Sequence, residues 1–238
     1  MGGGGFLMEP DNPLLDDFVL SLARRTPARV CFIPTASADS APAIVRFYRA
    51  FAGKCIASDL TFFDSPALPR RPSRTSDLAE FVAQQDVFYV GGGNTANLLS
   101  IWRAHRLDQV LTNAWRDGAV LAGVSAGMLC WFRGGVTDSY GGYEPLESGL
   151  RLIDALACPH WDGEAERQDV FRNMVRDRHD IGYAADDGAA LHFRGGELVD
   201  VIASRRDATA YRLSAAAGAV NEERLRARYL GEGGSEGC

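Results

Sequence analysis

A serine between two glycines is the strongest chemical signal in this sequence. Gly123-Val-Ser-Ala-Gly127 matches the pattern G-x-S-x-G, follows an apolar run and precedes a helical stretch. Small flanking residues allow a sharp turn from strand to helix that lifts the Ser125 hydroxyl clear of a sheet. The N-terminus of the helix then offers backbone N–H groups and a positive dipole end to a developing oxyanion. The pattern predicts a nucleophile at Ser125; the alternative is a serine that only caps the helix.

A serine nucleophile needs a base, and the position of His160 favours it over the other histidines. His160 lies in Cys158-Pro-His-Trp-Asp-Gly163, between an apolar segment and a helix. Loops at strand ends collect the catalytic groups of open α/β sheets. His192 falls inside an expected strand, and the remaining histidines lie in polar stretches. A base at His192 would give the residue order of an α/β-hydrolase esterase, which is the alternative, although too little chain follows it for the usual sheet of that class.

A carboxylate should orient the histidine, and several acidic residues are candidates. Those that lie near His160 or in expected loops and turns are Asp138, Asp162, Glu164, Asp186 and Asp187. The pair in Asp186-Asp187-Gly188 comes directly before an expected hairpin, in a turn that could approach the edge of the sheet. Aspartate and glycine also favour turns for purely local reasons, so spacing alone leaves the choice open.

The glycine-rich segment Gly91-Gly-Gly-Asn-Thr95 follows an expected strand, opens a helix and has two interpretations. Gly91, Gly93 and Ala96 fit the dinucleotide pattern G-x-G-x-x-A, which also needs an acidic residue after the next strand. That strand ends in Ala122-Gly-Val-Ser, without an acid. We therefore expect glycine amides of this loop to complete an oxyanion hole, and we expect no cofactor. The sequence has no H-x-H, H-E-x-x-H or cysteine cluster, so we expect no metal either.

Short apolar runs alternate with amphipathic stretches through the first half of the chain, which predicts βαβ units and a mainly parallel sheet. The expected strands are 29–35, 56–63, 86–90 and 119–124, and the expected helices are 41–52, 77–84, 107–116, 126–132 and one that begins near Thr95. Further along, 189–193 and 197–203 flank Arg194-Gly-Gly196 and predict a β-hairpin, with another strand at 211–213. Residues 1–238 are expected to form one domain. In such folds a glycine-rich loop like Gly2–Gly5 normally follows a strand, so either this strand is absent or the protein starts upstream.

The composition narrows the class of protein. The 238 residues include 46% hydrophobic and 24% charged residues, near the averages for soluble globular proteins. A net charge of −6 argues against nucleic acid as the main partner. No run approaches the roughly 20 apolar residues that span a bilayer, and the first residues do not resemble a signal peptide. Five scattered cysteines without a C-x-x-C pair indicate reduced thiols and a cytoplasmic location.

Taken together, these segments resemble the peptidase E family of aspartyl dipeptidases and the related cyanophycinases. The resemblance covers most of the chain and rests on Gly2-Gly-Gly-Gly-Phe6, Phe32-Ile-Pro-Thr-Ala36, Tyr89-Val-Gly-Gly-Gly-Asn-Thr95, Gly123-Val-Ser-Ala-Gly127, Cys158-Pro-His160 and Asp186-Asp187-Gly188, in this order. It implies a three-layer α/β fold, doubly wound around a mainly parallel sheet and similar to class I glutamine amidotransferase domains (flavodoxin-like). The expected hairpin would follow near its C-terminus.

The resemblance implies a serine peptidase that hydrolyses short peptides through an acyl-enzyme. Ser125 matches the nucleophile of the family and His160 matches the base. Gly92 and Ala126 match the donors of the oxyanion hole. Asp187 is the best match for the acidic third member, which is usually glutamate in the family and is one methylene shorter here.

The resemblance also implies a substrate site. Family members carry an arginine after the catalytic histidine that pairs with the aspartate side chain of the substrate, and Arg167 is the nearest counterpart, at a shorter spacing. On its expected helix Arg167 shares a face with Phe171 and Met174, which points it inward, whereas surface pairing with nearby acids is the alternative. We expect Arg167 and Asp138 to contact substrate.

The resemblance implies a short-peptide substrate, and its narrower expectation is a dipeptide with an N-terminal aspartate. The alternatives are a short-peptide carboxypeptidase of the same fold, an α/β-hydrolase-type esterase, and a catalytically silent amidotransferase-like module that binds a ligand. We expect no nucleic-acid or membrane partner, and a protein that is a monomer or a homodimer.

Overall fold

The apolar runs in the first half of the chain form four parallel strands of one sheet. The computed structural model describes residues 1–63, 75–178, 180–216 and 218–232. In it the sheet has the order β2-β1-β3-β4, and every neighbouring pair is parallel. Its strands are β1 (Arg29–Ile33), β2 (Ile56–Asp59), β3 (Val87–Val90) and β4 (Val120–Gly123). All four residues of β3 are buried, as expected for a parallel strand covered on both faces.

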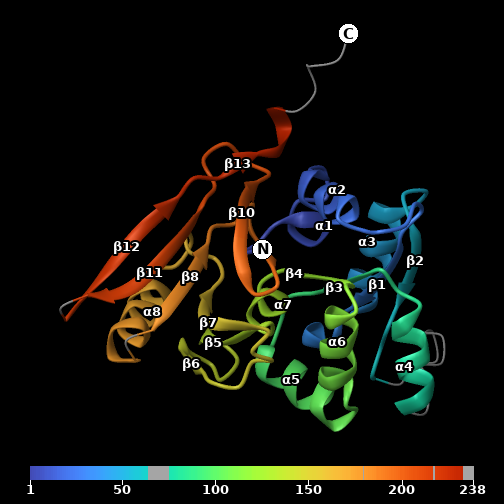
Figure 1. The fold of residues 1–238 in the computed structure, drawn as a ribbon, viewed down its shortest axis with the longest axis horizontal. Helices are drawn as coiled ribbons and strands as arrows, with labels where there is room; N and C mark the ends of the chain where they lie inside the picture. The colour runs from blue at the N-terminus through green and yellow to red at the C-terminus, as the bar shows by residue number, and fades with distance from the viewer. Residues whose placement is uncertain (64–74, 179, 217, 233–238) are drawn as a thin grey trace.

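Helices cover both faces of this sheet because successive side chains of each strand point to opposite sides. Val30 and Phe32 of β1 pack in one apolar cluster, and Cys31 and Ile33 pack in another. The first face is covered by α1 (Gly5–Met8), α2 (Leu14–Ser21) and α3 (Ala41–Phe51), and the second by η1 (Thr35–Ser37), α4 (Thr75–Ala83), α5 (Thr95–Ala104) and α6 (Leu107–Arg116). Figure 1 shows these layers, and the predicted three-layer α/β fold is confirmed.

A second, six-stranded sheet continues the fold with the order β12-β11-β8-β7-β5-β6. Its strands are β5 (Phe132–Thr137), β6 (Glu144–Leu146), β7 (Ile153–Cys158), β8 (Ile181–Ala185), β11 (Ala210–Ala216) and β12 (Ala219–Leu225). The inner strands β5, β7 and β8 are parallel, whereas β6, β11 and β12 are antiparallel to their neighbours. Helix α8 (Ala165–Arg178) packs on this sheet through Phe171, Met174 and Val175.

The predicted β-hairpin is present. β9 (Ala189–Arg194) and β10 (Glu197–Ala203) pair antiparallel around a turn at Gly195 and Gly196. β10 also pairs with β13 (Arg228–Tyr229), which leads into η2 (Leu230–Glu232). Figure 1 places the N-terminus near the middle of the molecule, close to β10 and β4.

Two expected elements are much shorter in the structure. The helix expected over 126–132 is only α7 (Ala126–Leu129), and the chain turns directly into β5. β5 contains Gly134 and Gly135, where a Cβ would overlap the carbonyl oxygens of Leu146 and Ala157, so the glycines let the neighbouring chain segments approach. The strand expected over 56–63 ends at Asp59.

No helix within the described ranges is both long and apolar enough to cross a membrane. Cys31, Cys55, Cys130 and Cys158 are free thiols, and all but Cys55 are buried. Burial raises the pKa of Cys130 well above its ordinary value, so this thiol is held in its neutral, unreactive form.

Candidate active site

Ser125 stands at the turn between β4 and α7. Its backbone has φ 56° and ψ −113°, a conformation that residues other than glycine rarely adopt. The two glycines of the motif make this turn possible, because a Cβ at Gly123 would overlap the Gly127 carbonyl and a Cβ at Gly127 would overlap the Val90 carbonyl. Strain of this kind is concentrated at functional sites.

Ser125, His160 and Asp187 form a continuous chain of hydrogen bonds. The Ser125 Oγ lies 2.8 Å from His160 Nε2, and His160 Nδ1 lies 2.6 Å from Asp187 Oδ1. His160 is held after β7 in a left-handed backbone conformation with φ 56°. The histidine and aspartate side chains are 20% and 26% exposed, so they are accessible but shielded from bulk water. This is the geometry of a nucleophile, a base and a group that orients the base.

Asp187 is fixed by contacts on its own backbone. Its N–H donates to Asp162 Oδ1 at 2.9 Å, and the next residue, Gly188, donates to the Gly3 carbonyl at 3.1 Å. The hydrogen bond with His160 lowers the pKa of Asp187 below its ordinary value, against the opposing effect of burial. Asp187 is therefore a carboxylate at neutral pH and can stabilise a positive charge on His160.

The other candidate acids form hydrogen bonds with groups other than His160. Asp162 contacts the backbone of Asp187, and Glu164 and Asp138 both pair with Arg167. Asp186 is buried and accepts a hydrogen bond from the Thr209 N–H at 2.9 Å. Burial raises the pKa of Asp186 to about 6.

His192, the base of the esterase alternative, is not the histidine that forms the hydrogen bond with Ser125. It stands on β9, where its ring packs edge-on against Phe18 at 5.6 Å. The structure therefore gives no support to the esterase arrangement.

Two backbone N–H groups next to Ser125 match the expected oxyanion donors. Gly92 lies so close that a Cβ built on it would be 3.2 Å from the Ser125 Cβ. Ala126 is the first residue of α7, where backbone N–H groups lack partners within the helix. Within the described part of the chain, neither N–H donates a hydrogen bond to another residue. Their position beside Ser125 suits them to bind an oxygen that becomes negative.

Arg167 lies on the inner face of α8, as predicted from the helix periodicity. Its side chain is only 5% exposed, although it carries a charge. Its Nε donates to Glu164 Oε2 at 2.8 Å, its Nη2 donates to Asp138 Oδ2 at 3.4 Å, and its guanidinium lies 4.6 Å from the centre of the Tyr143 ring. Arg167 also contributes to the lowered pKa of Asp187, which places its charge near the triad-like chain.

The sequence analysis gave pairing with nearby acids as the alternative for Arg167, and the structure shows such a pair with Glu164, but sequence reasoning missed Tyr143 beside it. A hydrogen bond from Tyr143, together with Arg167, lowers the pKa of Glu164. The spacing of three residues between Glu164 and Arg167 was a signal for this pair. No pattern in the sequence pointed to Tyr143, because it reaches α8 from the loop before β6.

Among the residues that the structure describes, no group of three or more histidine, cysteine or acidic side chains is arranged to hold a metal ion.

A doubly wound α/β fold in which a serine at a strand-to-helix turn is hydrogen-bonded to a histidine is typical of a class of serine-type hydrolases. The chain belongs to peptidase family S51, whose family model matches residues 1–201. It is therefore a peptidase of the serine type.

Proteins similar to this chain are also named as peptidases. The chain is 47% identical over 233 residues to a protein of Bacillus subtilis named "Uncharacterized peptidase YgaJ", with 97% of each chain covered. It is 28% identical over 132 residues to "Peptidase E" of Pasteurella multocida, covering 51% of this chain and 56% of that one. Among solved structures, a peptidase from an acI-B1 actinobacterium superposes with a TM-score of 0.68 at 20% identity, over 95% of this chain and 92% of that one, which shows a shared fold.

Proposed function

We propose that Ser125, His160 and Asp187 are the catalytic triad and that the protein hydrolyses short peptides through an acyl-enzyme. The observation that carries the proposal is the unbroken path of hydrogen bonds from Ser125 Oγ through His160 to Asp187. It begins at a strained serine, where backbone N–H groups are available for an oxyanion. A serine that only capped a helix would need neither the histidine nor the carboxylate.

The proposed reaction has two halves, formation of the acyl-enzyme and its hydrolysis, and the same groups act in both. Ser125 Oγ attacks the peptide carbonyl carbon while His160 Nε2 accepts its proton, and Asp187 stabilises the imidazolium. The carbonyl oxygen becomes negative and receives hydrogen bonds from the N–H groups of Gly92 and Ala126. The C–N bond then breaks, and His160 gives the proton to the leaving amine. A water molecule attacks the acyl-enzyme, with His160 as base again, and releases the acid and Ser125.

For the substrate we propose a short peptide with an N-terminal aspartate, recognised by Arg167 and Asp138. Arg167 uses two of its N–H groups on Glu164 and Asp138, which leaves others for a substrate carboxylate. Asp138 is 60% exposed and suits the α-ammonium group of the same substrate residue. An arginine of this kind would also suit the C-terminal carboxylate of a peptide, which keeps a carboxypeptidase as the second candidate. The free thiols favour action in the cytoplasm.

Substitution of the nucleophile tests the reaction. Ser125→Ala should lower kcat for peptide hydrolysis by roughly 10⁴- to 10⁶-fold and should abolish labelling by a fluorophosphonate probe. His160→Ala should lose a similar factor, and the double variant should lose no more, because triad members act as a unit. Circular dichroism should show both variants folded. A Ser125→Ala protein that keeps more than a tenth of the parent rate would contradict the assignment, and an unlabelled parent protein would favour the silent binding module.

Three dipeptides test the substrate. We expect kcat/KM for Asp-Leu to exceed that for Asn-Leu and Ala-Leu by roughly 100-fold or more, because only the aspartate carboxylate can form charge-assisted hydrogen bonds with the remaining N–H groups of Arg167. Arg167→Ala should remove this preference while leaving fluorophosphonate labelling of Ser125 intact. The matched control is Arg176→Ala, on the exposed part of the same helix. This variant should keep the preference for Asp-Leu. Equal values for the three dipeptides in the parent would refute aspartyl specificity without affecting the proposed triad.

A further inference from the structure

The hydrogen bonding between β8 and β11 changes at Asp186. The two strands pair antiparallel as far as Ala185 opposite Ala210, so the next pair is Asp186 opposite Thr209. Asp186 N donates to the Thr209 carbonyl at 3.0 Å, which is one of the two bonds that such a pair exchanges. The N–H of Thr209 donates instead to the Asp186 side chain, at 2.9 Å from Oδ2. In this ladder the carboxylate of Asp186 therefore takes the place of the backbone carbonyl of the same residue.

This exchange leaves the Asp186 carbonyl available to close a turn. It accepts a hydrogen bond from Ala189 N at 3.1 Å, the bond between the first and fourth residues of a β-turn. Asp187 and Gly188 are the two central residues, and Gly188 has φ 82°, which glycine adopts without strain. From the first central position Asp187 reaches His160. The turn that carries the orienting acid thus depends on the carbonyl of Asp186.

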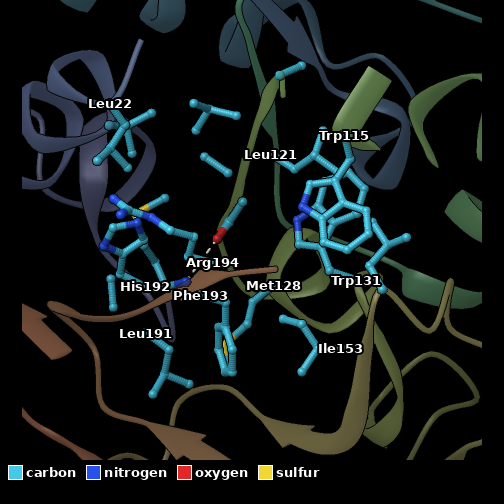
Figure 2. A pocket seen from close by; sticks show the side chains of 18 of the residues that line it. Leu22, Trp115, Leu121, Met128, Trp131, Ile153, Leu191, His192, Phe193 and Arg194 are labelled. Atoms are coloured by element: carbon cyan, nitrogen blue, oxygen red, sulfur yellow. Dashed lines mark hydrogen bonds between the residues drawn. The ribbon is translucent and has the colours of Figure 1, made fainter. Parts of the chain in front are cut away.

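The strand after the turn does not fix it by packing. β9 begins at Ala189, and its residues Leu191, His192 and Phe193 line an apolar cavity of about 670 Å³ (Figure 2). A strand that borders a cavity has fewer packing contacts on that side. We therefore expect the hydrogen bonds of the turn, rather than the packing of β9, to decide where the Asp187 side chain lies.

The side chain of Asp186 adds little to the stability of the fold. It is buried, and its Oδ1 has no hydrogen-bond partner in the part of the chain that the structure describes. Burying an acidic group with an unpartnered oxygen costs free energy, which offsets the gain from the bond to Thr209. We therefore expect the protein to fold without this carboxylate, so that its effect on the turn can be measured separately.

We propose that Asp186 is a positioning residue, whose side chain holds the turn in the form that presents Asp187 to His160. This inference rests on the proposed triad. Without an acceptor on the side chain at position 186, Thr209 N would bond to the backbone carbonyl, as an antiparallel pair does, and would compete with Ala189 N for it. The turn would then open, and the Asp187 carboxylate would move away from His160. Asp186 acts through Asp187 and takes no part in the proton transfers.

Alanine and asparagine at position 186 test the proposal. Asp186→Ala removes the acceptor, and we expect it to lower kcat by roughly tenfold or more for the dipeptide that the parent cleaves fastest. KM should stay within about twofold, because Arg167 is not displaced. The rate of fluorophosphonate labelling of Ser125 should fall with kcat. Asp186→Asn keeps an oxygen for the Thr209 N–H and should restore about half or more of the parent kcat.

Asp86 provides a matched control, because it makes the same two bonds elsewhere. Its N–H donates to the Arg29 carbonyl at 2.8 Å, and its Oδ2 accepts from Arg29 N at 2.8 Å. It precedes β3, whereas Ser125 follows the opposite end of the parallel strand β4. Asp86→Ala should lower Tm at least as much as Asp186→Ala while keeping the parent kcat. An equal loss of kcat in both variants would assign the effect to general destabilisation and overturn the proposal.

A double-mutant cycle with Asp187 separates this inference from the triad itself. In an Asp187→Ala protein, Asp186→Ala should lower kcat no further, because its effect passes through the missing carboxylate. The same fold loss with and without Asp187 would overturn the positioning role, as would a parent kcat in Asp186→Ala. A parent kcat in Asp187→Ala would instead contradict the proposed triad. If Asp186→Ala does not fold, Asp186→Leu, which fills the same space without an acceptor, replaces it in each comparison.

Discussion

His160 forms one hydrogen bond with Ser125 and one with Asp187, and the proposed roles of these two residues differ. In the proposed mechanism Ser125 exchanges a proton with Nε2, whereas Asp187 keeps Nδ1 protonated and the ring in place. Asp187→Asn retains the shape of the side chain but removes its charge and favours the wrong tautomer of His160. We expect kcat to fall by roughly 10³- to 10⁴-fold with little change in Tm, measured by peptide hydrolysis and thermal unfolding.

Asp162 provides the comparison for this prediction, because it contacts Asp187 only through the backbone N–H. Asp162→Asn keeps an oxygen acceptor at that position and should remain close to the parent rate. Normal activity of the Asp187→Asn variant together with an inactive Asp162→Asn variant would show that the orienting acid had been assigned to the wrong residue.

The loop from Met1 to Gly4 supports both ends of the proposed triad. Its Met1 carbonyl accepts from Ser125 N, and its Gly3 carbonyl accepts from Gly188 N, directly after Asp187. A Cβ at Gly3 would overlap Asp187 Oδ1, the oxygen that bonds to His160. The absence of a side chain at Gly3 is therefore a condition for the position of the carboxylate.

Gly3→Ala should displace the Asp187 carboxylate and lower kcat by about tenfold or more, while Tm falls by only a few degrees, roughly. Steady-state kinetics and thermal unfolding measure the two effects. The matched control is Gly142→Ala, where a Cβ would meet open space and the backbone is not left-handed. If both variants had the same kcat, the close approach of the loop would have no part in catalysis.

The fold also contains a buried acid that links its stability to pH. Asp16 of α2 accepts a hydrogen bond from Tyr89 of β3 at 2.9 Å, and burial raises its pKa to about 6. The unfolded chain releases this proton near pH 4, earlier than the folded protein does. The folded state therefore binds more protons between about pH 4 and pH 6, and its free energy of unfolding falls as pH rises through that range.

Asp16→Asn keeps an oxygen acceptor for Tyr89 and removes the ionisation. Between pH 4 and pH 7 its free energy of unfolding should fall by less than that of the parent, with a difference of up to about 3 kcal/mol. Urea unfolding at several pH values measures this. The neighbouring Asp17 is exposed and pairs with Lys54 at 2.7 Å, so Asp17→Asn should keep the pH slope of the parent. Identical slopes in all three proteins would show that Asp16 does not titrate in this range.

Local patterns in the sequence predicted the strands of the four-stranded sheet, the hairpin and the candidate reactive residues, but not β5, β8 or β12 of the six-stranded sheet. Short apolar runs and their spacing predicted β1, β3, β4 and the β9–β10 hairpin, because periodicity and turn residues are properties of neighbouring positions. The glycines around Ser125 predicted the strand-to-helix turn, and helix periodicity predicted the inner face for Arg167. The sequence also made His160 the preferred base.

Contacts between distant positions were decided only by the tertiary structure. Ser125 and His160 are 35 positions apart and His160 and Asp187 are 27 apart, so no local period could choose among the candidate acids. The short α7 and the start of β5 depend on backbone approach to Leu146 and Ala157, which no propensity describes. The contact of Tyr143 with Arg167 likewise joins two segments that are distant in the sequence. Propensity and periodicity act between neighbours in the chain, whereas packing joins whichever surfaces the completed sheets bring together.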